Sequence, residues 1–114
     1  MEIEIASWLS DIKQAINEIN EFLPDRKEFL AFQKDTKTKR AIERNIEIIG
    51  EAVNRILKAD PHFPIANARR IVDTRNRISH GYDSVSDDII WAIVIREIPN
   101  LNIEIRRLLE DFNP

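Results

Sequence analysis

Apolar residues recur at intervals of three and four along almost the whole chain, and this period constrains the fold more than any other feature. Only two glycines and five prolines interrupt it. Such spacing places apolar side chains on one face of an α-helix, whereas a half-buried strand requires strict alternation. The period therefore predicts an all-α protein.

The first half of the chain predicts two long helices and one short helix. The first covers roughly residues 3 to 22 and stops before Pro24. A short helix follows near residues 26 to 32, and the third begins at Asp35 or Thr36 and runs to about Lys58. Its predicted buried stripe consists of Ile42, Ile46, Ile49, Val53, Ile56 and Leu57. Gly50 lies near that stripe and costs about 1 kcal/mol relative to alanine, so we expect a neighbouring helix to approach closely there.

The second half predicts two further long helices. Pro64 suits the first turn of a fourth helix that runs to about Ser79 or His80, with Gly81 as its left-handed C-terminal cap. The fifth helix starts after Ser84 or Ser86. Its opening, "IIWAIVI" at residues 89 to 95, is apolar around its whole circumference and is therefore predicted to be buried.

Pro99 is expected to kink or split this last helix, because proline lacks the amide donor and its ring crowds the preceding turn. The predicted fold is an antiparallel bundle of four long helices and one short one, with the last helix kinked. At 114 residues the chain is expected to form one domain, residues 1–114.

The composition limits the kinds of site, location and partner that we expect for this chain. The chain has no cysteine, which excludes disulfides and thiolate metal sites. The start, "MEIEIASWLSDIKQ", has neither a basic segment nor a long apolar run, so we expect a cytoplasmic protein with no membrane association. Residues 26–80 carry 13 Lys and Arg against 7 Asp and Glu, within a chain of net charge -3. This basic middle is an electrostatic footprint for phosphates or a set of solvated helix faces.

Arg75 interrupts the apolar face of the fourth predicted helix. A guanidinium is almost never buried without a partner, so it needs a phosphate, a water-filled cleft or a carboxylate such as Glu51. Arg77 falls on another side of the helix and is read as a solvent-facing charge or an auxiliary RNA contact.

Two titratable residues follow at the end of the same helix. His80 falls in the last turn, where the helix dipole favours the charged imidazolium, so it is either a proton donor and acceptor or a surface capping residue. Tyr82 either offers its hydroxyl to a phosphate or seals the end of the core with its ring.

Together these residues resemble a known motif. Arg75-x4-His80-x-Tyr82, with Asn76 beside the arginine, is similar to the R-x(4-6)-H-x-Y motif of HEPN-domain ribonucleases. "ERNIEIIGEAVNRI" at 43–56 resembles the second signature of that family, and "HGYDSVSDDIIWAIVIREIPNL" its histidine turn and last helix. The pattern resembles the HepT branch, the toxins of HepT/MntA toxin-antitoxin pairs, over almost the entire chain.

The resemblance implies a metal-independent endoribonuclease that works as a homodimer, with motifs of both chains lining one cleft. In that reading His80 is the acid and base, Arg75 clamps the phosphate, and Asn76 and Tyr82 orient it. It also implies supporting roles for the second signature, through Arg44, Asn45 and Glu51.

The resemblance further implies a partner: a minimal nucleotidyltransferase antitoxin that transfers AMP to Tyr82 and so silences the toxin. The alternative is a non-catalytic HEPN subunit that only binds such a nucleotidyltransferase. A generic helical interaction domain would leave Arg75 without a purpose.

No cofactor or metal site is predicted beside these residues. Asp83, Asp87 and Asp88 cluster near a helix start, where carboxylates serve as caps and favourable dipole charges. His62 lies between two prolines and has no place in the family pattern. No glycine-rich phosphate loop or nucleophilic triad has sequence support.

Overall fold

The described part of the chain is entirely helical apart from its connections. The computed structural model describes residues 3–80 and 86–112, and at residues 75, 77–80 and 112 it describes the backbone only. Its elements are α1 (Ile3–Phe22), α2 (Phe29–Lys34), α3 (Thr36–Ala59), α4 (Ala68–His80), α5 (Asp87–Ala92), the π-helical turn η1 (Ile93–Glu97) and α6 (Ile98–Phe112). The predicted helical bundle is confirmed, with α5, η1 and α6 forming one interrupted last helix. In the described ranges no helix is long and apolar enough to cross a membrane.

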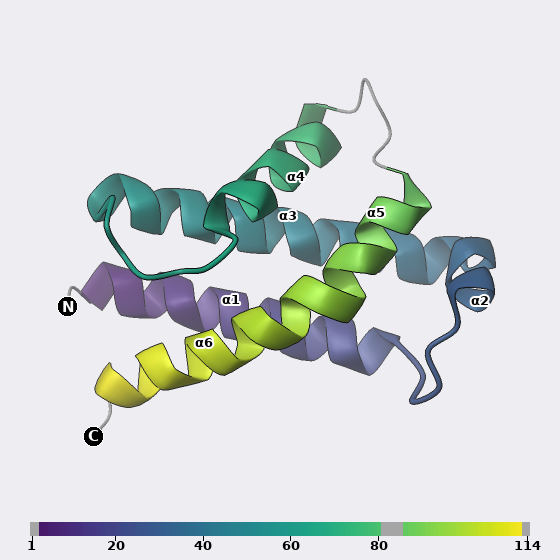
Figure 1. The fold of residues 1–114 in the computed structure, drawn as a ribbon, viewed down its shortest axis with the longest axis horizontal. Coiled ribbons are helices and arrows are strands. Elements are labelled where there is room, and N and C mark those ends of the chain that lie inside the picture. Colours follow the sequence, from purple (N-terminus) through teal and green to yellow (C-terminus); the bar gives the residue numbers. More distant parts are fainter. Residues whose placement is uncertain (1–2, 81–85, 113–114) are drawn as a thin grey trace.

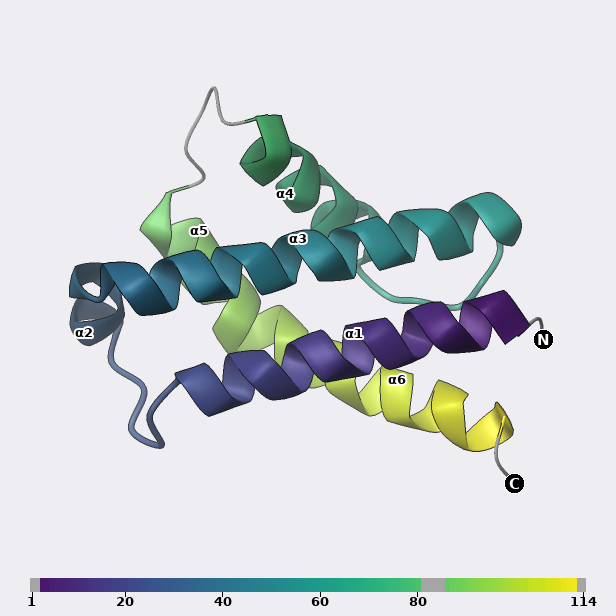
Figure 2. The same cartoon turned by 180° about the vertical axis from the view of Figure 1, so that it is seen from behind.

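The helices form two layers. α1 and α3 run antiparallel to each other and form one layer. α5, η1 and α6 form the second layer, which crosses one face of this pair (Figures 1 and 2). α4 packs against α3 and diverges from it toward its C-terminal end. The short α2 sits beside the start of α3, where the Phe32 and Trp91 rings lie 5.1 Å apart and join α2 to α5.

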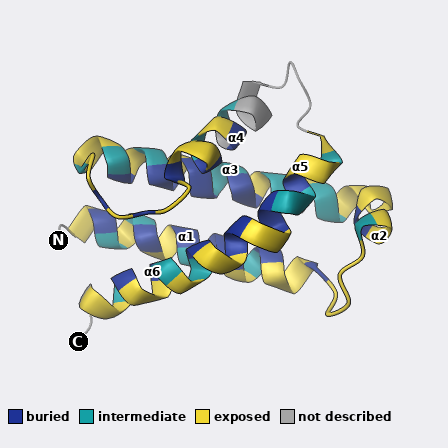
Figure 3. Cartoon of the chain, in the orientation of Figure 1, coloured by how far each residue is buried: buried dark blue, intermediate teal, exposed yellow. Residues whose placement is uncertain are grey.

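The core lies between the two layers and is built almost wholly from isoleucine and other aliphatic residues. Buried positions collect on the inward sides of α1 and α3 and under α5 and α6, whereas the outer faces are exposed (Figure 3). The stripe predicted on α3 is buried except for the partly buried Leu57. Gly50 is also buried, on a helix that packs against both α1 and α4, as the predicted close approach requires.

The start of α3 is fixed by one residue. Asp35 closes α2, where its amide donates to the Phe32 carbonyl, and it also caps α3. Its carboxylate accepts hydrogen bonds from the Thr38 amide at 3.1 Å and the Thr38 hydroxyl at 2.6 Å. These bonds satisfy a free amide at the helix start, and they lower the pKa of Asp35, the side-chain bond contributing most.

The last helix is split next to Pro99, as predicted. Proline has no amide to bond the carbonyl four residues earlier, and its ring crowds that carbonyl. The chain relieves this with one wide turn, in which the Ile98 amide donates to the Ile93 carbonyl five residues back. Helix geometry then resumes to residue 112.

Two predicted helix starts are wrong. α2 begins at Phe29 and not near residue 26, because Glu28 is extended. α4 begins at Ala68 and not at Pro64. The stretch before it is a non-helical turn that buries Phe63 and Ile65 on either side of the exposed Pro64, with the Ile65 amide donating to the Phe63 carbonyl at 2.9 Å, and Asn67 has a φ of 56°. A left-handed residue cannot continue a right-handed helix, so the helix starts just after it.

The predicted burial of residues 89 to 95 is wrong in part. Ile90, Ile93 and Val94 are buried, but Ile89 is 36% exposed and Ile95 is 40% exposed. The reason is that α5 and η1 lie on the surface of the bundle. In the described chain only one side of them meets the core (Figure 3).

Candidate active site

The motif lies on the last two turns of α4. Ala68, Ile71 and Thr74 form the buried face that seats the first turns of this helix on α3. Thr74 is a polar residue in that face. Its hydroxyl donates to the Arg70 carbonyl at 3.0 Å, so the hydroxyl is buried with a hydrogen-bond partner. The apolar first half of α4 thus holds the polar second half in place.

The helical backbone fixes how the motif residues are spaced. α4 continues to His80, which confirms the predicted end of this helix. Asn76 and His80 are four residues apart and therefore neighbours on one side of the helix, with Arg75 adjacent to Asn76. The Asn76 side chain is half-buried. The side chains of Arg75, Arg77, Ser79 and His80 lie outside the described residues, as do Gly81, Tyr82, Asp83 and Ser84 in full.

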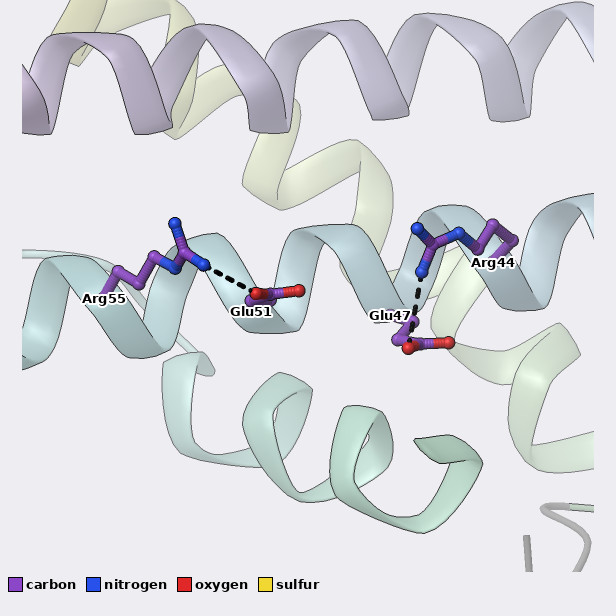
Figure 4. Close-up of polar contacts among 4 residues, drawn as sticks. All are labelled: Arg44, Glu47, Glu51 and Arg55. Atoms are coloured by element: carbon purple, nitrogen blue, oxygen red, sulfur yellow. Dashed lines mark hydrogen bonds and ion pairs between the residues drawn. The ribbon is translucent and has the colours of Figure 1, made fainter. Parts of the chain in front are cut away.

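The second signature lies along α3. Asn45 is buried, and its amide nitrogen donates to the Ala41 carbonyl at 3.1 Å. Arg44 pairs with Glu47 at 3.4 Å, and Glu51 pairs with Arg55 at 2.9 Å (Figure 4). Both ion pairs lie along one side of α3 with α1 and α4 to either side; the Glu51–Arg55 pair is exposed, whereas in the other pair Arg44 is exposed and Glu47 is partly buried.

These contacts show that Arg44, Asn45 and Glu51 have different surroundings. Asn45 is a structural residue of the core, because its side chain is turned back onto its own helix. Glu51 borders a groove between α1 and α3, together with Trp8 and Asp11, and its carboxylate is engaged by Arg55. The described contacts of Glu51 therefore join it to α3 itself, and Arg44 is an exposed basic group.

The acidic residues after the motif take part in local contacts. Asp87 pairs with Lys39 of α3 at 3.2 Å, which joins the start of α5 to the start of α3. Asp88 has a lowered pKa, chiefly because the Ser86 side chain bonds to it. Ser86 occupies the predicted cap position, but its side chain forms no capping hydrogen bond to the helix. Among the described residues no three carboxylate or imidazole groups gather as metal ligands do.

One polar contact next to α4 was not predicted. Glu97 of η1 is buried, and one carboxylate oxygen accepts from Arg70 Nε at 2.9 Å. The sequence held a signal for it, because Glu97 falls between Val94 and Leu101 on the apolar stripe of the last helix. An acid at such a position needs a partner for the same reason as Arg75 does.

Comparison with known proteins agrees with these features. The protein family described as "Ribonuclease HepT-like" matches residues 12–108. A protein of Methanocaldococcus jannaschii named "Putative RNase" is 33% identical over 112 residues, covering 95% of this chain and 89% of its own length. The "Probable ribonuclease HepT" of Thermococcus cleftensis is 33% identical over 105 residues, covering 89% and 92%. No solved structure matches significantly.

Proposed function

Because this chain belongs to the HepT-like ribonuclease family, we propose that it is a metal-independent endoribonuclease and the toxin of a toxin-antitoxin pair. The observation that carries the proposal is the register of α4. This helix ends at His80 and sets Asn76 one turn before it, with Arg75 alongside. A phosphate-binding group and a proton-transfer group then share the end of one rigid element.

The reaction that fits these groups is attack by the 2'-hydroxyl of RNA on the adjacent phosphorus. A base removes the 2'-hydroxyl proton, the new bond to phosphorus forms, the bond to the 5'-oxygen breaks, and an acid protonates that oxygen. Arg75 stabilises the charge on the phosphorane, and His80 transfers protons. Asn76 and Tyr82 orient the phosphate. The product ends are a 2',3'-cyclic phosphate and a 5'-hydroxyl.

A homodimer supplies what one chain lacks. Removing and supplying a proton calls for two titratable groups, and the motif has one histidine. Two chains related by a twofold axis would bring two copies of His80 to one cleft. We place the contact at α5 and η1, where Ile89 and Ile95 are exposed and would become buried in the dimer.

We propose that a minimal nucleotidyltransferase is the antitoxin and acts on Tyr82. The Tyr82 hydroxyl oxygen would attack the α-phosphate of ATP, lose its proton and release pyrophosphate, leaving AMP on the ring. The added phosphate charge beside Arg75 and His80 would repel RNA from the site. The position of Tyr82, two residues beyond the end of α4, supports this role.

The chemistry is tested with purified protein and an RNA oligonucleotide in excess EDTA. We expect cleavage to persist and to leave a cyclic phosphate, identified by the mass of the 5' fragment. An oligonucleotide with a 2'-deoxy residue at the cut site serves as the control and should stay intact. Cleavage of that control, or complete dependence on added Mg²⁺, would refute the proposed reaction.

Regulation is tested by co-expression with the cognate nucleotidyltransferase. Mass spectrometry of peptides should find adenylyl groups on Tyr82, and the modified protein should lose RNA cleavage. Tyr82→Phe removes the acceptor oxygen and should remain unmodified. A neutralised complex in which wild-type Tyr82 carries no adenylyl group would show that inhibition works by binding alone.

A further inference from the structure

Glu97 is a buried acid that the proposed chemistry does not use. Its side chain is only 8% exposed and lies among apolar residues of the last helix. One carboxylate oxygen bonds to Arg70 at 2.9 Å, and within the described ranges the other, Oε2, is buried without a hydrogen-bond partner. An ionised carboxylate in such surroundings is costly unless it is paired, so Arg70 is the group that makes its burial tolerable.

The pair joins α4 to the last helix. α4 packs chiefly against α3, and Arg70–Glu97 is the one ion pair described between α4 and another helix. Arg70 is itself 66% exposed, and it precedes Arg75 by five residues on the same helix. The contact therefore lies on the same helix as the motif, about one and a half turns before Arg75.

The wide turn next to Pro99 determines where Glu97 stands. Glu97 is the last residue of η1, in which the Ile98 amide bonds to the Ile93 carbonyl. Turns of this kind are rare in helices and occur often at functional sites. Here the turn ends on the one acid of the buried stripe, directly beside α4.

We propose that Glu97 is a positioning residue for the active site, acting through Arg70 on the orientation of α4. This inference rests on the proposed function. Packing of Ile71 and Thr74 seats α4 on α3, and the ion pair fixes its tilt against the last helix.

The geometry explains why a contact at Arg70 matters at His80. Ten residues separate them, which is about 15 Å along the helix axis at 1.5 Å per residue. A tilt of about 4° at Arg70 then moves the last turn by about 1 Å, and an error of that size costs up to about 100-fold in rate. The divergence of α4 from α3 toward this end is seen in Figure 1.

The test uses the wild-type protein and four variants. Glu97→Gln and Arg70→Gln each remove one charge of the pair, and the double variant removes both. Glu110→Gln, at an exposed position on α6, is the matched control. We would measure kcat and KM for RNA cleavage, and hydrogen exchange of the α4 amides with α1 as the internal reference.

We expect each single variant to lower kcat by about 10- to 100-fold with KM within about twofold of wild type. The double variant should be no slower than the slower single variant, because the two residues act as one unit. Exchange should quicken in α4 and not in α1. The control should match wild type in all three measurements.

Several results would overturn the inference. One is a loss of thermal stability with kcat and α4 exchange unchanged, and another is a raised KM for Arg70→Gln alone, which would mean direct RNA binding. If Glu97→Gln does not fold, Arg70→Gln decides the matter, since that side chain is mostly in solvent. If wild type cuts no RNA, the proposed function fails, and α4 exchange alone then decides whether the pair positions the helix.

Discussion

Asp35 shows how much a single side chain contributes to this fold. It ends α2, begins α3 and receives both of its side-chain hydrogen bonds from Thr38. Its lowered pKa means that the folded state favours the ionised form. The stabilisation is therefore present above the unfolded pKa, about 3.8, and is lost as the pH falls through the lower folded value.

Asp35→Ala should lower the melting temperature by a few degrees at pH 7, because it removes the cap of α3. The difference from wild type should shrink as the pH falls below about 4 and should be lost once the pH passes the lower pKa of the native carboxylate, which is then protonated. Thermal unfolding followed by circular dichroism at several pH values measures both effects. Asp25→Ala, at an exposed loop position, is the control. A difference that stayed constant down to pH 2 would contradict the role of the ionised carboxylate.

At the scale of the element, Gly50 allows α3 to contact its neighbours closely. It is a buried glycine on a helix that packs against both α1 and α4. We expect Gly50→Leu to reduce the free energy of unfolding by about 1–3 kcal/mol, because overpacking outweighs the gain in helix propensity. Urea unfolding measures this. Ala59→Leu, at the exposed end of the same helix, should change little, and a Gly50→Leu protein more stable than wild type would refute the close approach.

The elements also show what the sequence could predict. The bounds of α1 and α3 follow from their apolar period, from Pro24 and from the cap at Asp35, which are all local signals. The start of α4 does not follow from local signals. It depends on the left-handed conformation of Asn67 and on the burial of Phe63, which are set by contacts with the rest of the fold. The exposure of Ile95 has the same cause, since a run of apolar letters does not reveal how many sides of a helix meet the core.

In the candidate site, the local features could be predicted from the sequence and the long-range contact could not. Motif spacing predicts Arg75 and His80 as site residues, and it predicted the end of their helix, which the structure confirms, because that information lies within one short stretch. The Arg70–Glu97 pair joins residues 27 positions apart, and its formation depends on the turn before Pro99. Only the assembled layers bring these two residues together.

At the scale of the whole molecule, the proposed homodimer makes a prediction about its interface. Ile95→Glu should convert the dimer to a monomer and abolish cleavage, because a carboxylate would be buried without a partner in the apolar contact. Analytical ultracentrifugation would report the change, with a dissociation constant raised by at least about 10-fold. Ile3→Glu is the control, at an isoleucine 88% exposed at the other end of the fold. A dimer unaffected by Ile95→Glu would place the interface elsewhere.

In the proposed reaction His80 transfers protons, and the chain provides its own control because it has two histidines. His62 lies exposed in a turn, where its amide donates to Asp60. The decisive measurement is kcat for RNA cleavage in EDTA by wild type, His80→Ala and His62→Ala, with each protein first shown to be folded and dimeric. We expect kcat of His80→Ala to fall by about 10²- to 10⁴-fold and kcat of His62→Ala to stay close to that of wild type. Equal cleavage by wild type and His80→Ala would contradict this role of His80.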